Sequence, residues 1–157
     1  MNIQVDTREH HKEWLRIKAQ FDDLGVNYFR SKLFVGDYQS LDNPRLVIDR
    51  KKDLGELCSN VCQQHERFRA ELIRAQENGI QLIILVEHGG QIKSLGDVYF
   101  WDNPRRAVSP KAITGEALYK SLLTIRDKYG VRFEFCEEFH TGRKIVELLG
   151  GDPDGQD

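Results

Sequence analysis

Four acidic residues and one lysine occupy positions from which they could act on a phosphate. Asp6 and Glu9 belong to the segment VDTRE, Asp37 belongs to VGDY, and Asp49 and Lys51 belong to VIDRK. Two neighbouring carboxylates repel each other unless a cation lies between them, and hard oxygen ligands favour Mg²⁺ or Mn²⁺. A lysine beside such a site can stabilise a hydroxide nucleophile or a phosphate oxygen. Together these groups supply the chemistry of phosphodiester hydrolysis.

The spacing of Asp49 and Lys51 places both side chains on one face of an expected strand. They alternate with Arg50 in the run 45–51, and successive side chains of a strand point to opposite faces. Asp37 lies on the preceding strand of an expected hairpin, and pairing with residues 45–51 would bring it beside Asp49. The alternative interpretation of the segment DRKKD is a solvated turn in which Asp53 caps the next helix.

The rest of the chain alternates between strand-like and helix-like segments. Strands are expected at 3–6, as a bent pair within 26–40, and at 45–51, 81–87 and 131–137. Helices are expected over 14–24, 53–78 (with a break near Asn60), 115–129 and 141–151. The continuous apolar run 81–87 indicates a buried central strand. Residues 88–114 contain three glycines and two prolines and are expected to form a long irregular segment. The pattern predicts an α/β fold with a mixed central sheet flanked by helices.

Composition is consistent with one domain and does not exclude nucleic acid. The 157 residues have a net charge of −2 and 39% hydrophobic residues, which suits a single folded core rather than a disordered chain. The final eight residues hold three aspartates and no base, so we expect a domain over 1–149 and a flexible acidic tail over 150–157. Setting aside the tail acids and the four candidate site acids leaves 18 acids against 23 bases, a basic body around an acidic pocket.

The sequence gives several indications of compartment. No apolar run reaches the ~18–20 residues of a membrane span, and the N-terminus lacks the apolar stretch of a signal peptide. Three cysteines do not form a paired disulfide framework. We therefore expect no membrane association, with a cytoplasmic location for a prokaryotic or viral protein and a nuclear one for a eukaryotic protein.

Several motifs in a fixed order resemble one known family. The segments VDTRE, VGDY and VIDRKKDL, followed by a helix with QQHERFRAEL before the strand LIILVE, resemble the nuclease domain of the XPF family. The likeness is close from residue 3 to about residue 87 and continues as general α/β order. The family's Glu-Arg-Lys is Asp49-Arg50-Lys51 in this chain, and the wider restriction-endonuclease-like superfamily accepts either acid at that position.

The resemblance implies a restriction-endonuclease-like sheet, a Mg²⁺ or Mn²⁺ ion, and cleavage of branched or single-strand-containing DNA. Asp37 and Asp49 would be metal ligands and Lys51 the catalytic lysine. Asp6 and Glu9 would line the same site, as ligands of a second metal or as orienting groups. Arg50 would point its side chain to the opposite face of the strand, while its backbone carbonyl faces the metal.

Further residues are candidates for contacting DNA. Gln64 and Arg67 match positions where the family places polar residues facing the site, and Arg8 could form a salt bridge to a motif acid or contact DNA. A candidate DNA-binding loop combines aromatic and basic residues: Tyr99, Phe100, Trp101, Arg105, Arg106 and Lys111. The alternative for the aromatic residues is that they fold inward and close the core.

Partners and alternative functions remain open at this level. The C-terminal apolar residues 145–149 could cover the sheet or form a homodimer or heterodimer contact. A non-catalytic DNA-binding or scaffolding subunit of a nuclease complex is the main alternative function. Retention of Asp37, Asp49 and Lys51 favours activity. A small-molecule α/β enzyme would need a phosphate loop or a nucleophile elbow, and the sequence has neither.

Overall fold

The computed structural model describes residues 1–150, so all but the first residue of the expected tail lie outside the described residues. The strands are β1 (Asn2–Val5), β2 (Asn27–Arg30), β3 (Tyr38–Ser40), β4 (Asn43–Lys51), β5 (Gln81–Glu87) and β6 (Arg132–Cys136). The α-helices are α1 (His11–Asp23), α2 (Leu54–Cys62), α3 (His65–Glu77), α4 (Gly115–Tyr129) and α5 (Thr141–Leu149). Three short 3₁₀ helices complete the structure: η1 (Leu95–Phe100), η2 (Pro104–Ala107) and η3 (Glu138–His140).

The strands form one mixed sheet in the order β2-β1-β3-β4-β5-β6. β1 pairs with β2 in parallel and with β3 antiparallel, and β3 pairs antiparallel with β4. β4, β5 and β6 run parallel to one another, which places the ends of β4 and β5 at the same edge. The predicted mixed α/β fold is confirmed.

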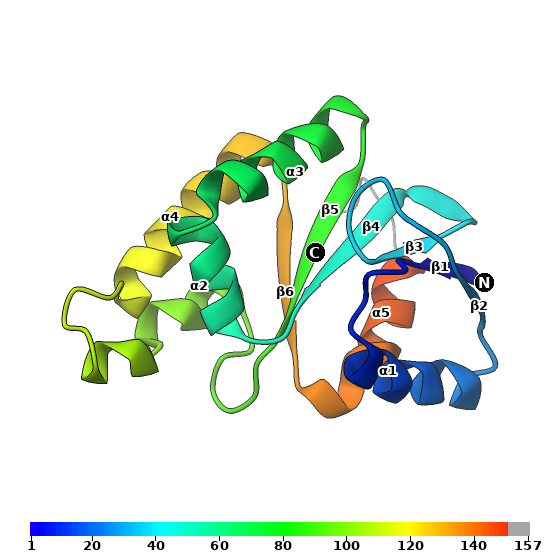
Figure 1. Cartoon of the computed structure of the whole chain (residues 1–157), viewed down its shortest axis with the longest axis horizontal. Coiled ribbons are helices and arrows are strands. Elements are labelled where there is room, and N and C mark those ends of the chain that lie inside the picture. Colours follow the sequence, from blue (N-terminus) through cyan, green and yellow to red (C-terminus); the bar gives the residue numbers. More distant parts are fainter. Residues whose placement is uncertain (151–157) are drawn as a thin grey trace.

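Helices cover both faces of the sheet (Figure 1), with α2, α3 and α4 on one side and α1 and α5 on the other. The central strands bury both faces, as the apolar run of β5 indicated. On β4, Val47 joins the core beneath α2–α4, whereas Leu46 and Ile48 join the core beneath α1 and α5. The same alternation continues to the end of β4, and it decides which side chains reach which face.

Local sequence signals account for the helix boundaries near the site. The Asp53 side chain accepts a hydrogen bond of 2.8 Å from the Glu56 backbone nitrogen and so caps α2 directly after β4. The expected break within 53–78 falls at Gln63 and Gln64, a few residues beyond the predicted position. The segment 88–114 is mostly irregular, as expected, but contains η1 and η2.

The apolar face of α5 covers the sheet. Ile145, Leu148 and Leu149 are buried in the core shared with α1 and β4. This confirms the sheet-covering role for these residues, and a dimer contact through this half stays a prediction.

No helix within residues 1–150 combines the length and apolar character needed to cross a membrane.

Candidate active site

Asp37 is held in place by its own backbone and by its carboxylate. Its backbone nitrogen donates to the Ile48 carbonyl at 2.8 Å, and its carbonyl accepts from the Asp6 nitrogen at 2.8 Å. Asp37 Oδ2 accepts a further hydrogen bond of 2.8 Å from the backbone nitrogen of Arg50. Three hydrogen bonds therefore fix Asp37 between the ends of β1 and β4.

Asp49 and Lys51 lie on the same face of β4, as their spacing predicted. Both side chains are buried, and Lys51 Nζ lies 3.1 Å from Asp49 Oδ2. The ammonium also lies 5.6 Å from the centre of the Phe68 ring on α3. Burial lowers the pKa of Lys51, but the Asp49 carboxylate and other acids raise it above its ordinary value, so Lys51 carries its charge.

The carboxyl groups of Asp37 and Asp49 converge and oppose each other's ionisation. Burial raises the pKa of Asp37 well above its usual range, and the charges of Asp49 and Glu9 raise it further. Asp49 Oδ2 is buried, and among the described residues its contact is the ion pair with Lys51 Nζ at 3.1 Å. Two repelling carboxylates that share one buried site form an environment that a divalent cation would stabilise.

Asp6 forms hydrogen bonds that organise the loop after β2. Its carboxylate accepts from the Leu33 nitrogen at 2.8 Å and from Arg8 Nε at 2.7 Å. Burial raises the pKa of Asp6, but these hydrogen bonds outweigh it and the net pKa is lowered. Of the two alternatives for Arg8, the salt bridge is present, although the guanidinium remains largely exposed to solvent.

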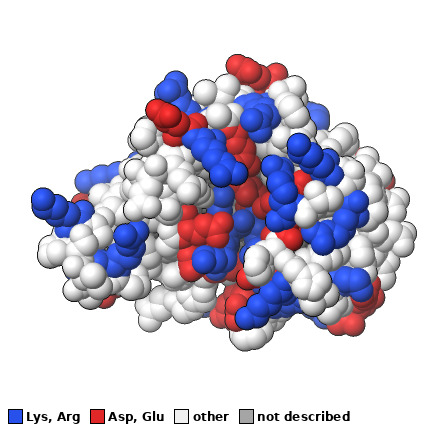
Figure 2. Space-filling model, viewed as in Figure 1, with Lys and Arg blue, Asp and Glu red and all other residues white. Residues whose placement is uncertain are grey.

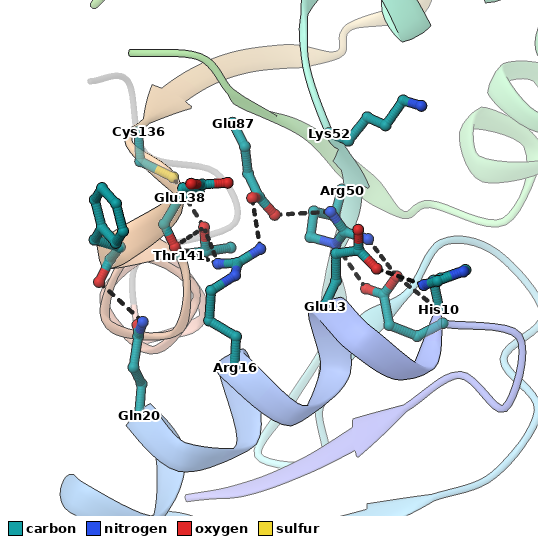
Figure 3. A network of polar contacts seen from close by, with 12 residues as sticks. His10, Glu13, Arg16, Gln20, Arg50, Lys52, Glu87, Cys136, Glu138 and Thr141 are labelled. Carbon is teal, nitrogen blue, oxygen red and sulfur yellow. Dashed lines mark hydrogen bonds and ion pairs between the residues drawn. The ribbon is translucent and has the colours of Figure 1, made fainter.

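A buried ionic network lies on the opposite face of β4. The Arg50 guanidinium donates to both carboxylate oxygens of Glu9, at 2.9 and 2.7 Å, and to Glu87 at 2.7 Å. Arg16 of α1 also donates to Glu87, at 2.7 Å, so that Arg16 and Arg50 approach Glu87 from two elements (Figure 3). The predicted opposite orientation of Arg50 is confirmed, and its side chain joins α1, β4 and β5.

These contacts limit the described residues that are free to bind a metal. Within residues 1–150 no three His, Cys, Asp or Glu side chains are grouped as a preformed metal centre. Asp6 and Glu9 already face arginines, so their role as ligands stays a prediction, as does that of the Arg50 carbonyl. The pair Asp37 and Asp49 still fits Mg²⁺, which commonly binds one or two carboxylates and keeps waters or phosphate oxygens in its other positions.

The Asp37–Asp49 pair lies between two adjoining depressions. One, of about 420 Å³, includes His10, Lys51 and Lys52, and the other, of about 440 Å³, includes Phe34 and Arg67. Figure 2 shows acidic side chains gathered in the middle of one face of the molecule, with basic side chains around them. Arg67, which the resemblance placed near the site, therefore borders it.

Glu71 is a site residue that the sequence interpretation missed. It lines the depression that contains Asp37 and Asp49. Burial and the Asp49 charge raise the pKa of Glu71 to about 7, against the opposing effects of Lys51 and Arg74. Arg67, Glu71 and Arg74 follow one another at helical spacing on α3, between buried Phe68, Leu72 and Ala75. This polar stripe beside the apolar face of the helix was the sequence signal that could have identified Glu71 as a site residue.

The remaining candidate DNA contacts fall into different surroundings. The Gln64 side chain accepts a hydrogen bond from Asn60 at 3.2 Å and borders a depression beside α2. Arg106 donates to the Ala112 carbonyl at 2.6 Å and so braces its own loop, whereas Arg105 and Lys111 line a cavity against α2. The aromatic residues of the loop differ in burial, because Trp101 packs against the core whereas Phe100 is 81% exposed.

The fold and the site define a restriction-endonuclease-like α/β domain. The chain belongs to the ERCC4 domain family, which matches residues 5–147 and confirms the predicted relationship to XPF nucleases. XPF from Aeropyrum pernix shares the fold with a TM-score of 0.68 and 21% identity over 95% of this chain and 63% of that one. The structure of the same protein in complex with DNA gives a TM-score of 0.66 and 22% identity, over 94% of this chain and 62% of that one. This chain thus spans somewhat under two thirds of these structures, and no curated protein sequence matches it.

Proposed function

We propose that this protein is a Mg²⁺- or Mn²⁺-dependent DNA endonuclease that acts on branched or single-strand-containing DNA. The observation that carries the proposal is the convergence of Asp37, Asp49 and Lys51 at one edge of the sheet, with Lys51 Nζ 3.1 Å from Asp49 Oδ2. Membership of the ERCC4 domain family and the likeness to an XPF protein in complex with DNA support DNA as the class of substrate.

Each site residue has a separate part in the proposed reaction. Asp37 and Asp49 would hold the ion, which when bound would polarise the phosphate and lower the pKa of a water molecule. The Lys51 ammonium would stabilise negative charge as it develops on the attacked phosphate. Arg67 and Arg74, on the stripe of α3 beside the site, would hold neighbouring phosphates.

The test is a cleavage assay on labelled single-stranded, duplex, flap, fork and four-way junction DNA with Mg²⁺, Mn²⁺ or EDTA. We expect metal-dependent cleavage of at least one substrate with an unpaired segment. Asp49→Asn and Lys51→Met should each lower the single-turnover rate about 10²–10³-fold. Lys128→Ala, which removes an exposed charge at the far end of α4, should leave the rate unchanged.

Two results would count against the proposal. One is full activity of Asp49→Ala, and the other is absence of cleavage of every substrate with either metal. DNA binding without cleavage would instead support the alternative function, a non-catalytic DNA-binding or scaffolding subunit. The presence of all three catalytic candidates in one arrangement favours the enzyme.

A further inference from the structure

A cavity of about 430 Å³ lies between α2 and the segment 103–113, outside the catalytic depressions. Cys58, Ala112 and Ile113 provide apolar wall surface, and Arg105 and Lys111 provide two cations. The volume lies within the range of small-molecule sites, ~300–1,000 Å³. Within the described residues 1–150, neither Arg105 nor Lys111 forms an ion pair.

The wall opposite α2, formed by residues 103–113, is stabilised by hydrogen bonds within that segment. Asn103, which is only 3% exposed, donates from Nδ2 to the Ile113 carbonyl at 2.9 Å and accepts from the Arg105 nitrogen at 3.1 Å. Arg106 donates to the Ala112 carbonyl and closes the same segment. The cavity is therefore formed before any ligand arrives, which lowers the entropic cost of binding.

The cavity connects to the catalytic site. A shallow depression shares Gly55, Ser59 and Arg105 with the cavity, and it shares Lys52 and Glu56 with the depression that holds Asp37 and Asp49. Gly55 follows Lys51 by four positions, so their α-carbons are at most about 14 Å apart. A strand whose phosphate lies at Lys51 can therefore reach the cavity within a few nucleotides.

We propose that this cavity, between α2 and residues 103–113, binds one unpaired nucleotide of the substrate strand. The base would enter against Cys58, Ala112 and Ile113, and Arg105 and Lys111 would contact the flanking phosphates. A base held in a cavity cannot remain paired, so the site selects DNA that is single-stranded on this side of the cut. This inference rests on the proposed nuclease function for its biological meaning, and it concerns a binding step that is measured separately.

Cys62 provides a reporter because it is exposed and lines the cavity. Cys58 is buried, and its burial together with Cys62 raises its pKa to about 12, so it reacts slowly with alkylating reagents. Cys136 lies elsewhere, beside Thr141, and serves as an internal control. The experiment measures iodoacetamide modification of Cys62 and Cys136 by peptide mass spectrometry in Asp49→Asn protein with EDTA, where cleavage does not interfere.

The probes are an oligothymidylate, an abasic strand of the same length and a blunt duplex. With oligothymidylate at ten times its Kd, Cys62 should react about tenfold more slowly, because only about one tenth of the protein is free. Cys136 should not change. The abasic strand and the duplex, each at ten times its own Kd, should slow Cys62 less than about twofold, since neither supplies a free base to the cavity.

Two variants test the site by fluorescence anisotropy. Ser59→Phe, which fills the cavity from α2, should weaken oligothymidylate binding about tenfold and bring it to the affinity of the abasic strand. Arg105→Ala should weaken both strands, whereas Lys128→Ala, about 20 Å from the cavity along α4, should change neither.

Equal protection by the abasic strand, unchanged Cys62 reactivity at saturation, or absence of oligothymidylate binding would each overturn the proposal. These outcomes are independent of catalysis. Protection of Cys62 in a protein that never cleaves DNA would leave the cavity proposal standing and reject the nuclease. Cleavage of DNA by a protein whose Cys62 is not protected would support the nuclease function and reject the cavity proposal.

Discussion

The backbone nitrogen of Arg50 donates a hydrogen bond of 2.8 Å to Asp37 Oδ2. One strand, β4, therefore supplies the Asp49 carboxylate, the Lys51 ammonium and the amide that orients the second carboxylate. The side chain of Arg50 meanwhile points to the other face and is fixed by Glu9 and Glu87. The position of β4 within the sheet thus controls the geometry of the whole site.

A divalent cation should stabilise the metal-free protein, because it would neutralise the repelling Asp37 and Asp49 carboxylates. At 100 times its Kd, Mg²⁺ or Mn²⁺ should add about 2.7 kcal/mol to the free energy of unfolding, which corresponds to a Tm rise of about 5–11 °C. Differential scanning fluorimetry after EDTA treatment measures this shift.

Asp37→Asn provides the matched control for the metal prediction. It should raise the Tm of the metal-free protein, because burial and the charges of Asp49 and Glu9 raise the pKa of Asp37 and so disfavour its charged form. It should also abolish most of the shift caused by Mn²⁺. A full metal-induced shift in this variant would contradict the assignment of Asp37 as a ligand.

Glu71 should make the metal-free protein less stable as the pH rises from about 4.5 to about 7. Its pKa is raised from 4.5 to about 7, so over this window the folded state binds more protons than the unfolded state and the free energy of unfolding falls with pH. The loss should be about 1–3 kcal/mol. Urea unfolding in EDTA at pH 5, 6, 7 and 8 measures it.

Glu71→Gln isolates this effect from other titrating groups. The variant should be the more stable protein at pH 8 and should show a smaller decrease between pH 5 and pH 8. Parallel stability curves for the two proteins would show that Glu71 titrates as it does in the unfolded chain.

The relative orientation of Asp49, Arg50 and Lys51 was predictable from sequence because it follows the simplest periodicity. Alternation along 45–51 predicted that Asp49 and Lys51 lie on one face of the strand and Arg50 on the other. The buried run of β5 likewise indicated a strand covered on both faces. These features depend on neighbours two or fewer residues away.

The partners of the charged residues were not predictable in the same way. Glu9, Arg50 and Glu87 are separated by 41 and 37 positions, and only the parallel pairing of β4 with β5 and the entry of α1 bring them together. Glu71 reaches the site because α3 packs over the face of β4 that carries Lys51. Long-range packing of this kind leaves only weak local signals.

Arg50→Ala should strongly destabilise the protein. The substitution leaves the buried carboxylate of Glu9 without its bidentate partner, and removal of one member of a buried ion pair typically costs about 3–5 kcal/mol. Urea unfolding at pH 7 measures the change. Lys18→Ala, which removes a solvent-exposed pair with Asp22, is the control and should cost less than about 1 kcal/mol.

A combined variant separates the buried charge from the lost side-chain volume. Glu9→Gln and Glu87→Gln together with Arg50→Met should recover much of the stability lost in Arg50→Ala, because no unpaired buried carboxylate remains in this network. If the combined variant is as unstable as Arg50→Ala, lost packing rather than unpaired charge is the cause.

Gly36→Ala should destabilise the fold and displace the adjacent catalytic candidate, Asp37. Gly36 has a φ of +72°, and an added Cβ would lie 2.5 Å from Val47 Cγ1 and 2.9 Å from the Ile48 carbonyl oxygen. The left-handed conformation and the overpacking together should cost about 2–5 kcal/mol. Because the Ile48 carbonyl also accepts the hydrogen bond of the Asp37 nitrogen, a shift at this point should weaken metal binding as well.

Gly25→Ala is the matched control, since Gly25 has a φ of +67° but no atom within 4 Å of an added Cβ. It should cost only the conformational part, about 1–2 kcal/mol, and leave the Mn²⁺-induced Tm shift unchanged. Urea unfolding and the metal-shift assay, applied to both variants, compare the two positions. Equal destabilisation with equal metal response would show that the close approach of Gly36 to β4 does not position Asp37.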